Sequence, residues 1–89
     1  MPQTKVVNVN RDQYDVYIGR GSIWGNPFRI GVDGTRKEVI DKYRIYLENN
    51  EKLLYHLQTL RGKRLGCYCK PKDCHGDVIV NTLNNVLGI

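Results

Sequence analysis

The alternation of hydrophobic and polar positions divides the chain into short extended and helical segments. β-Branched residues dominate residues 5–9, and residues 15–18 have the same character, so both segments are predicted strands. Only about five residues, most of them polar, separate the two, which is a length typical of a hairpin loop. The sequence therefore predicts that the first two strands pair with each other as a hairpin.

Apolar residues then recur every three or four positions, as they do on one face of an amphipathic helix. The first such helix follows Thr35, which forms a capping box with Glu38 by spacing, and it ends near Asn49. A second, shorter helix begins at Asn50 and is stopped by Gly62.

A third strand and a last helix complete the pattern. Residues 64–69 are a predicted strand, central in the sheet, and Asp73 is the expected cap of the helix that follows. The expected apolar face of this helix, together with the glycine expected at its end, comprises Val78, Ile79, Leu83, Val86, Leu87 and Gly88.

The predicted order is therefore β-β-α-α-β-α. Such elements form a small α/β or α+β domain, in which helices pack on one sheet of about three strands. The 89 residues, 1–89, are expected to make a single globular domain. A domain of this size buries only about 60–65% of its unfolded surface, so a pocket is expected at an edge or between elements.

Composition narrows the class of protein. Hydrophobic residues make up 40% and charged residues 26% of the chain, which is typical of a globular protein. No apolar run approaches the roughly 18 residues that span a bilayer, and residues 1–5 lack the apolar region of a signal peptide. We therefore expect a cytoplasmic protein with no membrane role. The thin core is also compatible with a homodimer.

The net charge of +5 favours anionic partners. Five cations fall within twelve residues, namely Arg61, Lys63, Arg64, Lys70 and Lys72. This run is either a solvated surface or a rim that attracts phosphates, and the second alternative includes nucleic acid.

All three cysteines lie within residues 67–74, and an odd, clustered set argues against a disulfide framework. Cys67 and Cys69 are two residues apart in a strand, so they should face the same side. Cys74 and His75 follow at the start of the last helix. A junction from strand to helix is a place where anions and thiolates are stabilised, because unpaired N–H groups and the positive end of the helix dipole meet there.

Three interpretations of this segment stay open. In the first, Cys69 or Cys74 is a catalytic nucleophile, His75 carries the proton and Asp77 orients it. In the second, zinc is bound by Cys67, Cys69, Cys74 and His75, although neighbouring ligands suit a tetrahedral ion poorly. In the third, no cofactor is bound and the cysteines are buried residues of the core.

Residues 19–28 are too rich in glycine and proline to form a regular element, yet they hold the chain's only Trp and only Phe. The favoured interpretation is that Trp24 and Phe28 close the thin core. The glycines also allow backbone N–H groups to approach a ligand, with Arg20 or Asn26 contacting it.

These segments carry a resemblance to a known family. The motifs in question are Tyr17-Ile18-Gly19-Arg20, Trp24-Gly25-Asn26-Pro27-Phe28, Leu65-Gly66-Cys67-Tyr68-Cys69 and Cys74-His75-Gly76-Asp77. Residues 5–83 resemble the small single-domain family catalogued as domain of unknown function 4326, which occurs in bacteria, archaea and their viruses. The family has no established activity, so the resemblance implies domain limits and a site, not a reaction.

We therefore expect a pocket between residues 20–28 and residues 69–77 that binds, and in one interpretation processes, a nucleotide or other anionic small ligand. The expected binding residues are Arg20, Trp24, Asn26 and Gly76. The alternative is a module that binds nucleic acid or a protein partner without catalysis, held together by zinc. The sequence leaves open whether the protein is an enzyme.

Overall fold

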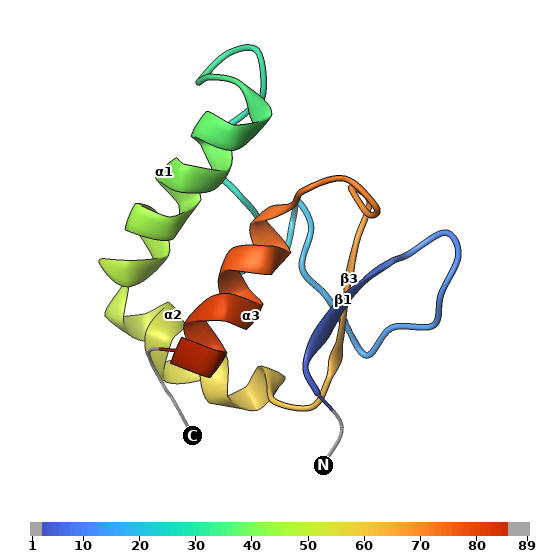
Figure 1. The fold of residues 1–89 in the computed structure, drawn as a ribbon. Helices are drawn as coiled ribbons and strands as arrows, with labels where there is room; N and C mark the ends of the chain where they lie inside the picture. The colour runs from blue at the N-terminus through green and yellow to red at the C-terminus, as the bar shows by residue number, and fades with distance from the viewer. Residues whose placement is uncertain (1–2, 86–89) are drawn as a thin grey trace.

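The helices and strands follow the expected order. The computed structural model describes residues 3–85 (Figure 1). Its elements are β1 (Lys5–Asn8), β2 (Val16–Tyr17), α1 (Arg36–Glu48), α2 (Glu51–His56), the 3-10 turn η1 (Leu57–Leu60), β3 (Arg64–Cys67) and α3 (His75–Asn85). The predicted class, a small sheet of three strands with helices packed on it, is confirmed. No helix within residues 3–85 has the length and apolar character needed to cross a membrane.

The sheet is built around its last strand. The strand order is β1-β3-β2, and both outer strands run parallel to β3. Val6 of β1 and Val16 of β2 both lie opposite Leu65. The predicted central position of the third strand is therefore correct, whereas the predicted hairpin between the first two strands is wrong.

The segment of residues 9–15 explains why the hairpin does not form. It returns the chain to the start of the sheet and passes over β3 at Gly66. A Cβ atom at position 66 would lie 2.7 Å from Cγ of Tyr14 and 2.8 Å from Cγ1 of Val9, so only glycine leaves room. Parallel strands normally need a longer crossover, but β2 has only two residues and the return path is short.

The helices cover the other face of the sheet. Leu65 and Cys67 alternate with Gly66 along β3 and are buried in the core. The capping box of α1 is present, with the Glu38 amide donating to the Thr35 hydroxyl at 3.3 Å and the Thr35 amide donating to the Glu38 carboxylate at 2.9 Å. In Figure 1, α1, α2 and α3 lie on one side of β3, and residues 9–15 lie on the other.

The start of α3 differs from expectation, because Cys74 rather than Asp73 caps it. The Gly76 amide donates to Cys74 Sγ at 3.3 Å, and the Asp77 carboxylate accepts the Cys74 amide at 3.0 Å. A thiol thus takes the position usually held by an oxygen. At the other end of this helix, the expected Val86, Leu87 and Gly88 lie outside the described residues.

Candidate functional site

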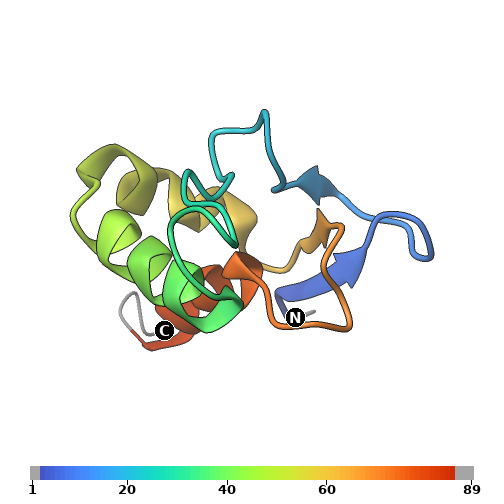
Figure 2. The same ribbon diagram turned by 90° about the horizontal axis from the view of Figure 1, so that it is seen from above.

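A cavity of about 300 Å³ lies where β2 and β3 end. Because the two strands are parallel, the segments that leave them, residues 18–30 and residues 68–74, start from the same edge of the sheet. Figure 2 looks onto this edge and shows both segments bordering it, with the starts of α1 and α3 alongside. Residues 20–28 and 69–77, which are distant in the sequence, therefore contribute to one cavity.

The wall of the cavity combines cations with aromatic rings. Arg20 and Arg36 are the two guanidinium groups that line it, and Tyr17, Phe28 and Tyr68 are the aromatic ones. The Arg36 side chain donates to the Asp73 carbonyl at 3.0 Å, and the Arg20 side chain makes a long contact of 3.4 Å with the Asn26 carbonyl. The rings of Tyr17 and Tyr68 meet edge to face, with centroids 6.1 Å apart.

Three free cysteines are among the residues that line the cavity. The Sγ atoms of Cys67, Cys69 and Cys74 are all within 4.8 Å of one another, and those of Cys67 and Cys74 are 3.0 Å apart. Cys67 and Cys74 are buried, whereas Cys69 is half-buried. The expectation that Cys67 and Cys69 face the same side is consistent with this grouping, although β3 ends at Cys67.

The environment separates the acidities of the two buried thiols. The hydrogen bond from the Cys74 thiol lowers the pKa of Cys67, and backbone N–H groups of Cys69 and Lys70 act in the same direction. The same thiol–thiol hydrogen bond, together with burial, raises the pKa of Cys74. The pair therefore holds on to one proton while Cys67 loses its own more readily.

His75 is fixed by the backbone of Ile18, the residue that follows β2. Its Nε2 lies 2.7 Å from the Ile18 carbonyl, which can only accept, so Nε2 carries a hydrogen and Nδ1 of the neutral ring is an acceptor. Nδ1 is 3.6 Å from Cys74 Sγ. Burial lowers the pKa of His75, which favours the neutral ring. The geometry thus places a proton acceptor beside the thiol of Cys74.

Asp77 and Gly76 serve the start of the helix rather than the cavity. The Asp77 carboxylate binds Lys70 Nζ at 2.5 Å and the Cys74 amide, whereas the Ile18 carbonyl orients His75. A Cβ atom at position 76 would lie 2.7 Å from Cδ1 of Ile18. The absence of a side chain at Gly76 therefore lets α3 pack closely against Ile18. The expected orienting role of Asp77 and the expected ligand contact of Gly76 stay predictions, because these contacts serve the start of α3 and do not test them.

Trp24 and Asn26 also work inside the protein. Trp24 is 4% exposed in the core and its carbonyl accepts the Tyr43 hydroxyl at 2.8 Å. Asn26 lines the cavity, but its side chain donates to the Val39 carbonyl at 3.1 Å and accepts the Phe28 amide at 3.0 Å. These bonds hold residues 18–30 against α1, so the loop is a braced wall.

Sequence reasoning missed three of the cationic and aromatic side chains that line the cavity. Arg36 is the first residue of α1 and follows the capping Thr35, so its signal was that of a helix start. Tyr17 and Tyr68 lie at the ends of strands. The carboxyl ends of parallel strands are favoured ligand positions, but this signal needs the strand directions, which the sequence does not show.

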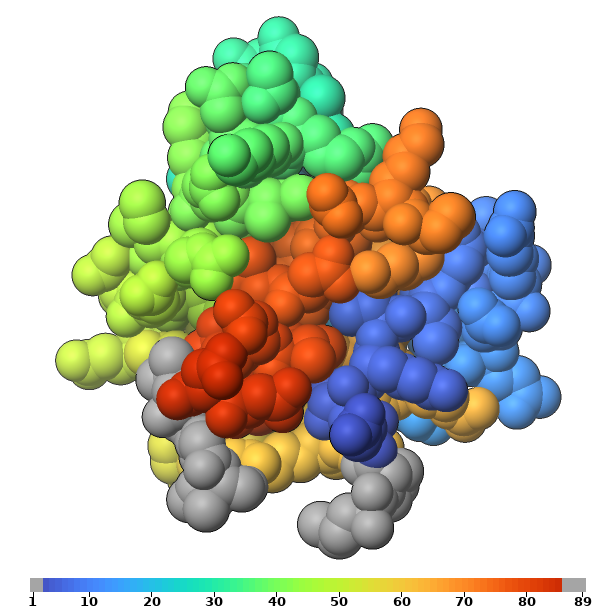
Figure 3. Space-filling model, in the orientation of Figure 1, coloured from blue at the N-terminus to red at the C-terminus, as the bar shows by residue number. Residues whose placement is uncertain are grey.

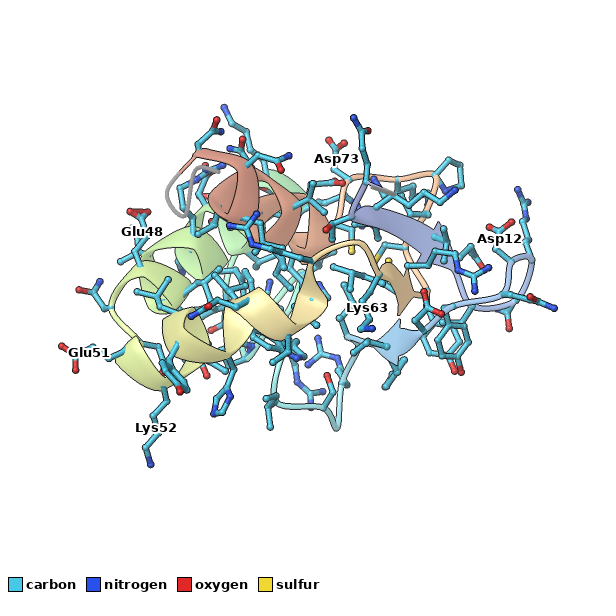
Figure 4. The ribbon with its side chains drawn as sticks, turned by 90° about the horizontal axis from the view of Figure 1, so that it is seen from below. Asp12, Glu48, Glu51, Lys52, Lys63 and Asp73 are labelled. Atoms are coloured by element: carbon cyan, nitrogen blue, oxygen red, sulfur yellow. The ribbon has the colours of Figure 1, made fainter. Side chains whose placement is uncertain are left out.

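The five clustered cations do not form one rim. Arg61, Lys63 and Arg64 lie at the amino end of β3, whereas Lys70 and Lys72 follow its carboxyl end. Figure 4 labels Lys63 and Asp73, which mark the residues before and after the strand. Arg64 and Lys70 are moreover paired with acidic side chains.

A second, larger hollow of about 620 Å³ is lined by residues of β1, α1 and α3. Figure 3 shows these three elements in blue, green and orange to red on one face of the molecule. Its charged lining mixes signs, with Lys37 and Arg44 beside Asp41 and Asp77. It is a wider surface groove and holds none of the thiols. The smaller cavity is therefore the candidate site.

Comparisons with known proteins give a family and two viral relatives. The family described as "Domain of unknown function (DUF4326)" matches residues 3–85. An uncharacterised 12.4 kDa protein from the nrdA-td intergenic region of Enterobacteria phage T4 is 41% identical over 87 residues, covering 92% of this chain and 79% of the relative. An uncharacterised protein of Acanthamoeba polyphaga mimivirus is 33% identical over 84 residues, covering 74% of this chain and 64% of the relative. No solved structure matches.

Proposed function

This chain belongs to the DUF4326 family, and we propose that the cavity at the carboxyl edge of its sheet binds a small anionic ligand of the nucleotide class. One observation carries the proposal: Arg20 and Arg36 share a cavity wall with the rings of Tyr17, Phe28 and Tyr68. Guanidinium groups match phosphate oxygens in a planar, forked geometry. Aromatic rings offer a face or an edge to a base.

The position and the size of the cavity support this class of ligand. Ligands of open parallel sheets collect at the carboxyl ends of the strands, and the cavity lies at the ends of β2 and β3. Its volume of about 300 Å³ is at the lower end of the range for small-molecule sites. The ligand is therefore of mononucleotide size or smaller.

The two arginines have different freedom to act. Arg36 is held by its bond to the Asp73 carbonyl, which uses one of its five N–H donors and leaves the rest of the fork for an anion. Arg20 is exposed, and its hydrogen bond to the Asn26 carbonyl, at 3.4 Å, is long and therefore weak. Arg20 is thus the side chain that can turn toward a phosphate at little cost to the fold.

The test compares Arg20→Gln with Arg11→Gln by calorimetric titration. The ligands are ribonucleoside and deoxyribonucleoside monophosphates, the parent nucleosides and inorganic phosphate. Losing a charged hydrogen bond worth about 1.5–3 kcal/mol should weaken binding of the phosphorylated ligand by about 10-fold or more. Arg11 precedes Asp12, which Figure 4 shows at the outer tip of the loop of residues 9–15, so Arg11→Gln removes the same charge away from the cavity.

Two results would contradict the proposal. One is that the wild-type protein binds none of these ligands at millimolar concentration. The other is that both variants weaken binding equally, which would make the effect one of net charge. A nucleic-acid-binding module is distinguished by salt, because the affinity for a short single-stranded oligonucleotide would then fall steeply with salt concentration. A ligand held in the cavity should show a much shallower dependence.

A further inference from the structure

We propose that Cys67, Cys69 and Cys74 form a three-thiolate site for a thiophilic divalent metal ion such as zinc, with its fourth coordination position facing the cavity. The metal site stands on the geometry of the sulfur atoms. The proposed function enters at one point only: an anion bound in the cavity would meet the fourth position of the ion.

The spacing of the sulfur atoms fits one ion. Tetrahedral zinc with bonds of about 2.3 Å places its sulfur ligands about 3.8 Å apart. The three Sγ atoms lie within 4.8 Å of one another, and the shortest separation, between Cys67 and Cys74, is 3.0 Å. Binding would open that pair by about 0.8 Å, which small rotations of the two side chains supply.

The backbone around the sulfur atoms is arranged to support negative charge. The Gly76 amide donates to Cys74 Sγ at 3.3 Å, and the backbone N–H groups of Cys69 and Lys70 favour the thiolate form of Cys67. Donors to the ligand atoms orient and stabilise thiolates in metal sites. Three thiolates and a divalent ion leave one negative charge in total, and the Lys70 ammonium, although it is paired with Asp77, also favours the thiolate of Cys67 through its charge.

The fourth position differs from the one that the sequence suggests. Among residues 3–85, the group of mutually close ligand atoms contains the three thiols and not His75. The His75 ring is instead held by the Ile18 carbonyl. All three cysteines line the cavity, so the open side of the ion would face it. Zinc sites with three protein ligands keep their fourth position for water or another small ligand.

The experiment uses the full chain, reduced and free of metal, titrated with Co²⁺ and then with Zn²⁺. We expect one equivalent of Co²⁺ to give thiolate-to-cobalt charge-transfer bands and the visible bands of a tetrahedral ion, and Zn²⁺ to displace it. Bound Zn²⁺ should protect all three thiols from an alkylating reagent. Each of Cys67→Ser, Cys69→Ser and Cys74→Ser should weaken zinc binding by at least about 100-fold, more than the loss of an outer partner does.

The Cys→Ser variants need a folding control, because Cys67 and Cys74 are buried. Circular dichroism of each metal-free variant supplies it. If a variant does not fold, thiol protection in the wild-type protein decides instead, and it requires no substitution. X-ray absorption of the zinc-loaded protein reports the ligand set: three sulfur atoms and one light atom without imidazole scattering support the open position, and imidazole scattering overturns it.

Uptake of less than about one-tenth of an equivalent of either Co²⁺ or Zn²⁺ by reduced, folded protein at micromolar concentration would end the metal proposal, because a zinc site of this kind should be saturated by Zn²⁺ there. The metal proposal would also end if Cys67 and Cys74 formed a disulfide on oxidation while the reduced protein bound no metal. Nucleotide titrations of the metal-free and the zinc-loaded protein separate the two proposals. Metal uptake without nucleotide binding contradicts the proposed function alone, and nucleotide binding without metal uptake contradicts this inference alone.

Discussion

The two ends of β3 carry similar numbers of charged residues, but they use them differently. At the amino end, Arg64 forms an ion pair with Asp15 on the surface, with a 3.1 Å contact and with both side chains about two-fifths exposed. At the carboxyl end, Lys70 pairs with Asp77, which also accepts the Cys74 amide. The first pair lies on the surface beside β3, whereas the second connects the loop after β3 to the start of α3.

The comparison shows that the contribution of an ion pair to the structure depends on the other hydrogen bonds that its two residues form. An exposed pair in high dielectric adds little to stability. Asp77 adds a backbone bond to its pairing, and this bond fixes the residue whose sulfur caps α3. If the carboxyl end is a braced site and the amino end a solvated surface, substitutions near the carboxyl end should change the stability of the protein more than substitutions at the amino end.

The largest effect is expected from Tyr43→Phe, which tests the bracing of residues 18–30. The Tyr43 hydroxyl is buried and donates to the Trp24 carbonyl at 2.8 Å. Its removal leaves that carbonyl unpaired in the core, which should lower the free energy of unfolding by about 1–3 kcal/mol in urea denaturation.

Tyr55→Phe is the control for that measurement. Tyr55 is 72% exposed, so losing its hydroxyl should change the free energy of unfolding by less than about 0.5 kcal/mol. Equal effects of the two substitutions would show that the Trp24 carbonyl finds another partner, and that the loop is not held by Tyr43.

A smaller effect is expected from Asn26→Ala. The variant loses the bonds to the Val39 carbonyl and the Phe28 amide, both of which are partly accessible to water, so unfolding should become easier by about 1 kcal/mol. Hydrogen exchange at the Phe28 amide should become faster. Asn10→Ala, in the exposed turn after β1, is the matched control, and faster exchange at the Phe28 amide in that variant too would contradict a local effect.

The smallest effect is expected at the amino end, from the titration of Asp15. The hydrogen bond from the Arg64 side chain, together with that from the Arg64 amide, lowers the pKa of Asp15 from 3.8 to about 2. Because the folded-state pKa is depressed, the stabilisation is present above pH 3.8 and is lost as the pH falls toward 2.

Carboxyl chemical shifts measured by NMR check this value. Arg64→Gln should move the midpoint of Asp15 back toward 3.8, while the melting temperature at neutral pH changes little. A wild-type midpoint near 3.8 would show that the guanidinium does not hold the carboxylate in solution.

The elements that were predicted correctly depend on local interactions. The capping box of Thr35 and Glu38 and the apolar spacing of Val39, Tyr43 and Leu47 lie within one helix, so the sequence shows them directly. The hairpin was wrong because the partner of both outer strands is β3, which follows some fifty residues later. Gly66 was the signal that another segment crosses β3, but the sequence does not say which segment.

The candidate site divides in the same way. That residues 20–28 and 69–77 contribute to one cavity could be anticipated, because glycine-rich loops and junctions from strand to helix are favoured ligand positions. The tasks of single residues could not, because they depend on partners from other elements. Asn26 binds α1 and Gly76 packs on Ile18, and the sequence shows neither partner; the ligand contacts expected of both residues stay predictions.

The position of β3 in the sheet has a consequence for the order in which the molecule can form. Both outer strands leave the ribosome early, yet the strand that joins them is made only after α1, α2 and η1. Until β3 is made, neither outer strand has a strand to pair with. A chain truncated before Arg64 therefore loses the whole sheet and not only one edge strand.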